Sequence, residues 1–134
     1  MTDEEKFKRL YRCLNRWLLC AHEGKKLSEF LKEKTVSSVG IYGYGALGVN
    51  AVRELLMEQF PILWVADRKQ IVGSDAYATF TADEVGSAPQ PDAIIISSVT
   101  DTEIIEKKLQ DLFQCEIITI EELIDCLFEW GNKY

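Results

Sequence analysis

The sequence predicts an α/β fold with a doubly wound parallel sheet of about five strands in the order 3-2-1-4-5, preceded by an N-terminal α-helical extension. Short apolar runs alternate with helical patterns, which favours parallel strands joined by right-handed helical crossovers. One of these runs ends in a Gly-x-Gly-x-x-Gly turn that opens a helix at once. The 134 residues, 47% of them hydrophobic, are enough for one packed domain.

The glycine turn lies in the stretch 38–48, where a strand, the turn and the start of a helix follow one another. This is the arrangement of a Rossmann-type dinucleotide-binding turn. Gly43 is expected to make the tight turn, Gly45 to let a pyrophosphate approach the backbone, and Gly48 to let the helix pack closely on the strand. The free N–H groups at the helix N-terminus favour a phosphate there. The predicted binding residues of the turn are Gly43, Tyr44, Gly45, Ala46, Leu47 and Gly48.

An acidic residue follows the next apolar run. The run 62–66 ends in Asp67, 19 residues after Gly48, where an acid would meet the ribose hydroxyls of an adenosine. The alternative is that Asp67 merely caps the loop after its strand. Arg68 and Lys69 could accept a 2′-phosphate, but Asp67 would repel one. NAD or another unphosphorylated ribose is therefore favoured over NADP, and Arg68 is included in the predicted site.

Further candidate contacts come from the clearest apolar run, residues 92–97. Ser97 and Ser98 fall at its carboxyl end, next to the first strand in the expected order. Ligands of doubly wound sheets bind in the crevice between those two strands. Tyr44 either stacks on or hydrogen-bonds a ligand there, or is simply exposed in the loop.

Element boundaries follow from caps and apolar periodicity. The Thr-x-x-Glu capping pattern predicts helix starts at Thr2, Thr81, Thr100 and Thr119, and Gly24 is expected to end the first helix. The helix after Thr81 is expected to have one or two turns. The other expected elements are a short helix carrying Leu27, Phe30 and Leu31, the strands 36–42, 62–66, 76–78, 92–97 and 116–119, and the helix 46–59.

Residues 1–35 are predicted to form the helical extension, and residues 36–134 the Rossmann-like domain. Residues 1–37 carry nine Lys or Arg and six Asp or Glu, whereas the rest of the chain carries six and sixteen. The extension either packs on its own domain or mediates a homodimer or docking on a partner protein. Its expected buried stripe is Phe7, Leu10, Leu14, Trp17, Leu18 and Ala21, flanked by Cys13 and Cys20.

Composition excludes several classes of function. The net charge of −7 argues against binding a nucleic-acid backbone. Apolar runs are too short to span a membrane, and the charged N-terminus does not look like a signal peptide, so a cytoplasmic location is expected. The four cysteines lack metal-ligand spacing, which favours buried thiols in a reducing compartment and no metal site.

No catalytic residues are predicted. His22 is the only histidine and lies in the helical extension, so no Ser/His/Asp or Cys/His set can be assembled around the turn. The acid pair Glu121 and Glu122 is interpreted as a helix start rather than as an acid–base pair.

The stretch Val39–Gly48 resembles the opening of an NAD-type or nucleotide-sugar Rossmann domain. With Asp67-Arg68, Gly73 and Asp92-Ala93-Ile94-Ile95-Ile96 in the same order, the chain is similar to small modules attached to polysaccharide-biosynthesis enzymes and sugar methyltransferases. The resemblance implies a nucleotide or nucleotide-sugar ligand and no particular reaction.

The favoured function is a binding module for a dinucleotide or nucleotide sugar, NAD first, serving as an accessory or regulatory part of a polysaccharide or glycan biosynthesis protein. Such a module would not be catalytic on its own. One alternative is a subunit of an NAD(P)-dependent enzyme whose site is completed by oligomerisation. The other is a protein-interaction domain with a vestigial nucleotide site, in which Tyr44 or Leu47 fills the turn.

Overall fold

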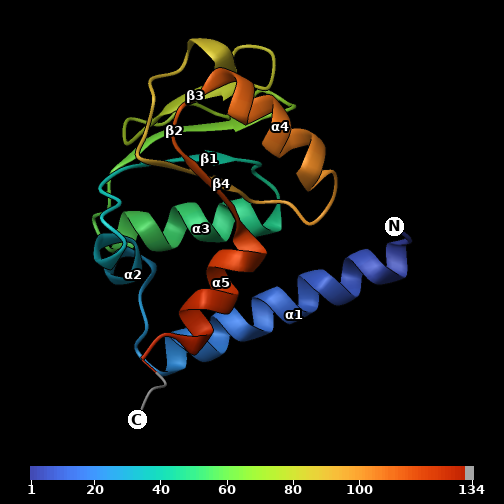
Figure 1. Ribbon diagram of the computed structural model, residues 1–134, viewed down its shortest axis with the longest axis vertical. Coiled ribbons are helices and arrows are strands. Elements are labelled where there is room, and N and C mark those ends of the chain that lie inside the picture. Colours follow the sequence, from blue (N-terminus) through green and yellow to red (C-terminus); the bar gives the residue numbers. More distant parts are fainter. Residues whose placement is uncertain (132–134) are drawn as a thin grey trace.

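Residues 1–131 are described by a computed structural model, in which five parallel strands form a single sheet (Figure 1). The strands are β1 (Val39–Tyr42), β2 (Ile62–Asp67), β3 (Ala78–Thr81), β4 (Ala93–Ile96) and β5 (Glu116–Thr119). Their order is β3-β2-β1-β4-β5, which confirms the predicted Rossmann-like fold and strand order. The order reverses between β1 and β4, the neighbours that bound the ligand crevice in folds of this type.

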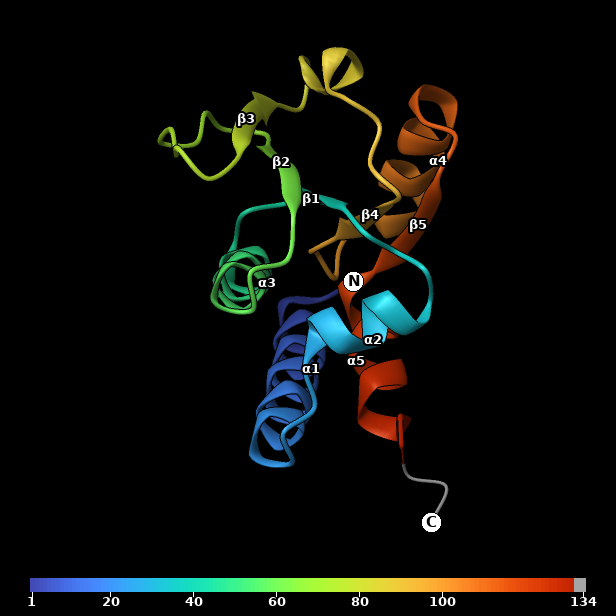
Figure 2. The ribbon, with the colours of Figure 1, turned by 90° about the vertical axis from the view of Figure 1, so that its left-hand side faces the viewer.

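Helices cover the two faces of the sheet unequally. The helical segments are α1 (Asp3–His22), α2 (Leu27–Glu33), α3 (Ala46–Met57), the 3-10 turn η1 (Val85–Ser87), α4 (Thr102–Leu112) and α5 (Ile120–Glu129). One face is covered by α3 and α5, with α1 and α2 packed outside them, and the other carries α4 and η1 (Figures 1 and 2). Within residues 1–131, no helix has the length and apolar character to cross a membrane.

Trp64 fills the face of the sheet that α4 covers. Its indole lies over Gly40 of β1, stacks on Phe113 with ring centroids 5.7 Å apart, and donates a hydrogen bond to the Pro89 carbonyl oxygen at 2.8 Å. Because its N–H has a partner, the whole side chain can be buried without an unsatisfied polar group.

The N-terminal helices belong to the same hydrophobic core as the sheet. The α1 side chains that enter it are Cys13, Trp17 and Cys20, and those of α2 are Leu27, Phe30 and Leu31. Two ion pairs join α1 to α5: the Arg9 guanidinium with Glu121, and Arg16 with Asp125. The extension therefore packs on its own domain, one of the two arrangements that its sequence left open.

The first turn of α2 is capped from another helix. Lys26, its N-cap residue, makes no side-chain cap, and two carboxylates of α3 replace one. Glu54 accepts from the Leu27 N–H, and Glu58 accepts from the Ser28 N–H, both at 2.8 Å. Glu54 also accepts a 2.8 Å hydrogen bond from the Trp17 indole N–H. Burial, followed by hydrogen bonding with Glu58, raises the pKa of Glu54 to about 7.

Two of the four predicted threonine N-caps form as expected. The Thr2 hydroxyl accepts from the Glu5 N–H at 3.1 Å, and the Thr119 hydroxyl accepts from the Glu122 N–H at 3.2 Å. Gly24, with φ of +73°, follows the end of α1, as its predicted role as a stop requires. The sequence pattern therefore placed the ends of α1 and the start of α5 correctly.

The other two N-caps differ from the prediction. The Glu84 carboxylate accepts from the Thr81 N–H and hydroxyl, which lowers the pKa of Glu84. The single 3-10 turn η1 is within the expected one or two turns, but its N-cap is Glu84 rather than Thr81. At α4 the N-cap is Asp101 rather than Thr100, with a left-handed φ of +56°. The Thr100 prediction is wrong because the backbone of Thr100 is bonded to the Ser98 hydroxyl instead.

Some strand and helix limits also shift. The third strand is Ala78–Thr81 rather than 76–78, because parallel pairing with β2 begins at the pair Trp64 and Ala78. The first strand begins at Val39 rather than Val36, and the helix predicted over 46–59 ends at Met57. Gln59 takes a left-handed φ of +58° there, which stops the helix before Pro61.

The expected buried stripe of α1 is partly wrong. Phe7 and Leu18 are 66% and 55% exposed, whereas the flanking Cys13 and Cys20 are buried. On α4, Ile104 and Leu112 are also exposed. Apolar residues occupy more of these helices than their neighbours cover, because α5 contacts only one side of α1 and α4 lies alone at its edge of the sheet.

The fit of Trp64 over β1 makes Gly40 intolerant of a side chain. A Cβ at position 40 would lie 2.4 Å from the indole, so Gly40→Ala should lower the free energy of unfolding by about 2 kcal/mol. Urea denaturation measures this loss. Gly73→Ala is the matched control, because a Cβ there meets nothing within 4 Å. Equal stability of the two variants would contradict the close packing of Trp64 on Gly40.

The raised pKa of Glu54 predicts a pH-dependent stability. Between about pH 4.5 and 7 the folded chain holds this proton more tightly than the unfolded chain does, so the contribution of Glu54 to stability falls as the pH rises. After allowance for solvent screening we expect a loss of about 1 kcal/mol across this window. Denaturant titrations of the wild type and Glu54→Gln should show this slope only in the wild type. An unchanged slope in the variant would assign it to another group.

Candidate functional site

The glycine turn is held between the ends of two neighbouring strands. Gly43 directly follows β1 and has a φ of +110°, a conformation that favours glycine. Its N–H donates to the Ala66 carbonyl oxygen on β2 at 2.8 Å, and the Tyr42 carbonyl oxygen accepts from the Ser97 N–H after β4 at 2.9 Å. These bonds fix the turn at the carboxyl edge of the sheet, where β1 lies between β2 and β4.

Gly48 allows α3 to cross this turn at close range. A Cβ at position 48 would lie 1.9 Å from the Gly43 carbonyl oxygen and 3.5 Å from the Ser97 Cβ. Backbone cannot yield as a flexible side chain can, so the crossing requires glycine at this position. The predicted role of Gly48 in close helix packing is confirmed.

Gly45 lies on the open side of the turn. It is the N-cap of α3, no side chain caps the helix start, and a Cβ at position 45 would meet nothing within 4 Å. The first turn of α3 carries no acidic residue, whereas those of α1, α2, α4 and α5 all do. Ala46 is exposed, and the Leu47 side chain is buried in the core beneath the helix. The helix start therefore combines accessible backbone with an uncompensated dipole.

Tyr44 and Asp67 lie together beside the turn. The Tyr44 N–H donates to the Asp67 Oδ1 at 3.3 Å, and both residues are half-buried. The Tyr44 side chain also contacts Tyr77, whose pKa is raised by burial and by the neighbouring Tyr44 hydroxyl. Asp67 thus stands at the end of β2 and touches the turn, and its carboxylate already accepts one backbone hydrogen bond.

Arg68 extends from the end of β2 toward the start of α4. Its guanidinium forms an ion pair with Asp101 at 3.4 Å, and its side chain is largely exposed. Lys69 beside it is also exposed. A cation at this edge of the sheet is thus already paired with a carboxylate.

Ser97 and Ser98 differ in their hydrogen bonding. Ser98 lies in a local turn, where its hydroxyl accepts from the Thr100 N–H at 3.1 Å. Ser97 is 5% exposed, and its Oγ has no hydrogen-bond partner among residues 1–131. The Ser97 Cβ lies next to the positions that Cβ atoms of Gly43 and Gly48 would occupy. A buried hydroxyl without a partner therefore lies directly beneath the glycine turn, at the neighbouring strand end.

The structure thus brings all the predicted site residues to one edge of the sheet, on three segments: the turn 43–48, the end of β2 and the end of β4. No protein-family model matches this chain. No curated protein matches it either. Geometry and chemistry alone therefore support a function for this edge.

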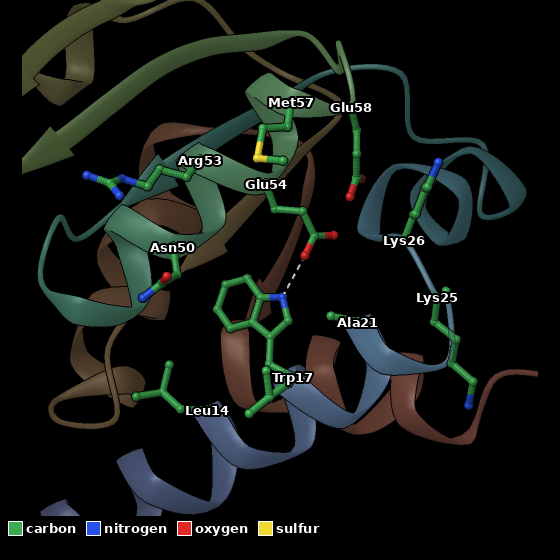
Figure 3. A pocket seen from close by; sticks show the side chains of 12 residues that line it. Leu14, Trp17, Ala21, Lys25, Lys26, Asn50, Arg53, Glu54, Met57 and Glu58 are labelled. Atoms are coloured by element: carbon green, nitrogen blue, oxygen red, sulfur yellow. Dashed lines mark hydrogen bonds between the residues drawn. The ribbon is translucent and has the colours of Figure 1, made fainter.

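A second concave feature was missed by the sequence analysis. A hollow of about 640 Å³ lies between α1 and α3, lined by Leu14, Trp17, Ala21, Arg53, Glu54 and Met57 among others (Figure 3). Its position depends on how α1 packs, which no local pattern reveals. The only available signal was the spacing of Glu54 and Glu58, two acids one turn apart on a helix whose other face is apolar.

The second and third glycines of the motif should differ in their tolerance of substitution. Gly48→Ala should lower the free energy of unfolding by about 3 kcal/mol, because its Cβ overlaps a backbone oxygen. Gly45→Ala should change it by no more than about 0.5 kcal/mol, since the added methyl group faces open space. Thermal and urea denaturation measure both. A strongly destabilised Gly45→Ala chain would show that the turn is filled.

Proposed function

We propose that this chain binds the diphosphate of a dinucleotide or nucleotide sugar at the glycine turn, with NAD favoured. The observation that carries the proposal is the open, uncapped helix start at Gly45. Backbone N–H groups of the first turn of α3 would donate to the phosphate oxygens, and the helix dipole would favour their negative charge. The chain is acidic overall, so recognition by backbone rather than by lysines suits its charge of −7.

Ser97 supports the same position. A buried hydroxyl without a partner carries a free-energy cost, which a ligand oxygen would remove if a shift of the turn exposed the hydroxyl. Ser97 lies beneath Gly43 and Gly48, between the ends of β1 and β4, and ligands of doubly wound sheets bind outside these strand ends. The open helix start at Gly45 and the unpaired Ser97 hydroxyl thus lie at the same edge of the sheet.

Asp67 is proposed to accept the hydroxyls of an unphosphorylated ribose. Its Oδ1 accepts from the Tyr44 N–H, and among residues 1–131 its Oδ2 has no hydrogen-bond donor that would compete with a ligand. A 2′-phosphate would meet this carboxylate, and the nearby Arg68 is already paired with Asp101. These charges favour NAD or a nucleotide sugar over NADP.

Catalysis is not part of the proposal. The single histidine, His22, is the last residue of α1 and so belongs to none of the three segments that form the edge at the glycine turn. We propose an accessory or regulatory role in polysaccharide or glycan biosynthesis, which rests on the resemblance of Asp67-Arg68, Gly73 and the strand at 92–96 to modules of those proteins.

Ligand titration tests the proposed site. Calorimetry and thermal denaturation should show binding of NAD or UDP-glucose and weaker binding of NADP, and a ligand present at a hundredfold excess over its dissociation constant should stabilise the chain by about 2.7 kcal/mol. Gly45→Val should abolish the stabilisation without unfolding the protein, because its side chain enters only the ligand space.

Gly73→Val is the matched control, since position 73 is also open and lies in the loop before β3. Asp67→Ala should raise the dissociation constant for NAD at least tenfold. It should also reduce the difference between the affinities for NAD and NADP. The proposal is overturned if no nucleotide binds at millimolar concentration, or if Gly45→Val binds as the wild type does.

A further inference from the structure

One side of α1 carries an apolar stripe that nothing in the described chain covers. Phe7, Tyr11 and Leu18 are 66%, 72% and 55% exposed, and Leu14 between them is half-buried. Their spacing places all four on one line along the helix. We call these four residues the α1 stripe. Residues 1–8 are all exposed, so the first two turns of α1 extend beyond α5 (Figure 1).

The C-terminal end of the stripe opens into the hollow between α1 and α3. Leu14 and Leu18 belong to its α1 wall, together with Trp17 and Ala21. Met57 of α3, which is 84% exposed, forms part of the opposite rim (Figure 3). The same helix therefore carries a projecting aromatic ring, Phe7, near one end and an apolar depression near the other. Phe7 and Leu18 are about 16 Å apart along the axis.

We propose that a second copy of this chain covers this surface, with the two α1 helices antiparallel about a two-fold axis. A two-fold interface must be self-complementary, and the α1 stripe meets this requirement. When Phe7 of one copy lies opposite Leu18 of the other, Tyr11 automatically lies opposite Leu14. Each Phe7 ring then enters the hollow of the opposite copy, and the axis passes between Tyr11 and Leu14.

Charge complementarity supports the same orientation. The first turn of α1 carries Asp3, Glu4 and Glu5, and the exposed Lys26 lies at the far end of the hollow, beyond Ala21 (Figure 3). In the antiparallel dimer the acidic first turn of one copy extends past Leu18 of the other toward Lys26. A parallel pairing would instead place the two acidic turns side by side, which opposes that arrangement.

Sedimentation equilibrium from 1 to 100 µM tests the dimer. The wild-type chain should dimerise within this range, and Phe7→Glu should raise the dissociation constant at least tenfold, because each dimer contains the substitution twice. Ile104→Glu is the control, because Ile104 is 72% exposed but lies on α4, on the other side of the sheet. The dissociation constant of the Ile104→Glu dimer should match that of the wild-type dimer. Circular dichroism verifies folding, and Phe7→Ala serves if the glutamate variant unfolds.

Cysteine cross-linking tests the orientation, in a background with the exposed Cys126 replaced by serine. A mixture of Phe7→Cys and Leu18→Cys chains should form the mixed disulfide in preference to either symmetric one. A monomeric wild type at 100 µM, a Phe7 variant that associates like the wild type, or a preferred Phe7→Cys homodimer would each overturn the proposal. None of these outcomes depends on nucleotide binding, so the two proposals can fail separately.

Discussion

The close crossing of α3 over the glycine turn is the constraint on which the rest of the structure depends. With only 1.9 Å between a notional Gly48 Cβ and the Gly43 carbonyl oxygen, helix and turn can adopt this spacing only where position 48 lacks a side chain. The Ser97 Cβ lies close to the same two glycines, and the Ser97 N–H donates to the Tyr42 carbonyl oxygen, which joins the end of β4 to the start of the turn. The backbone at Gly45 is consequently held in a fixed relation to the carboxyl ends of β1, β2 and β4.

The positive charge at this edge of the sheet comes mainly from backbone dipoles. The helix start supplies partial positive charge without a lysine, and Arg68 is balanced by Asp101. Fixed dipoles would need no side-chain ordering to bind the proposed ligand, and they suit a domain whose sheet region is strongly acidic. The same acidity leaves the basic N-terminal helices as the complementary part of the molecule, and these make ion pairs with α5 through Arg9 and Arg16.

The fold was largely predictable because its signals are local. Apolar runs, the glycine spacing and the caps at Thr2 and Thr119 each depend on residues close in sequence. Contacts between distant segments were not predictable. The Asp67 bond to the Tyr44 N–H, the unpartnered Ser97 hydroxyl and the Ser98 turn that displaces the α4 cap all depend on how strand ends meet. On α1, apolar residues span more than one face, so periodicity alone could not distinguish buried Cys13 from exposed Phe7.

The capping of α2 by α3 has a consequence for local opening. The Leu27 and Ser28 amides find their acceptors on Glu54 and Glu58, so the short α2 begins on groups that belong to another helix. A seven-residue helix is too short to persist by itself. Any fluctuation that separates α2 from α3 therefore removes its first hydrogen bonds and its packing surface together. Exchange of the Leu27 and Ser28 amide protons with solvent would then report the rate at which these two helices part.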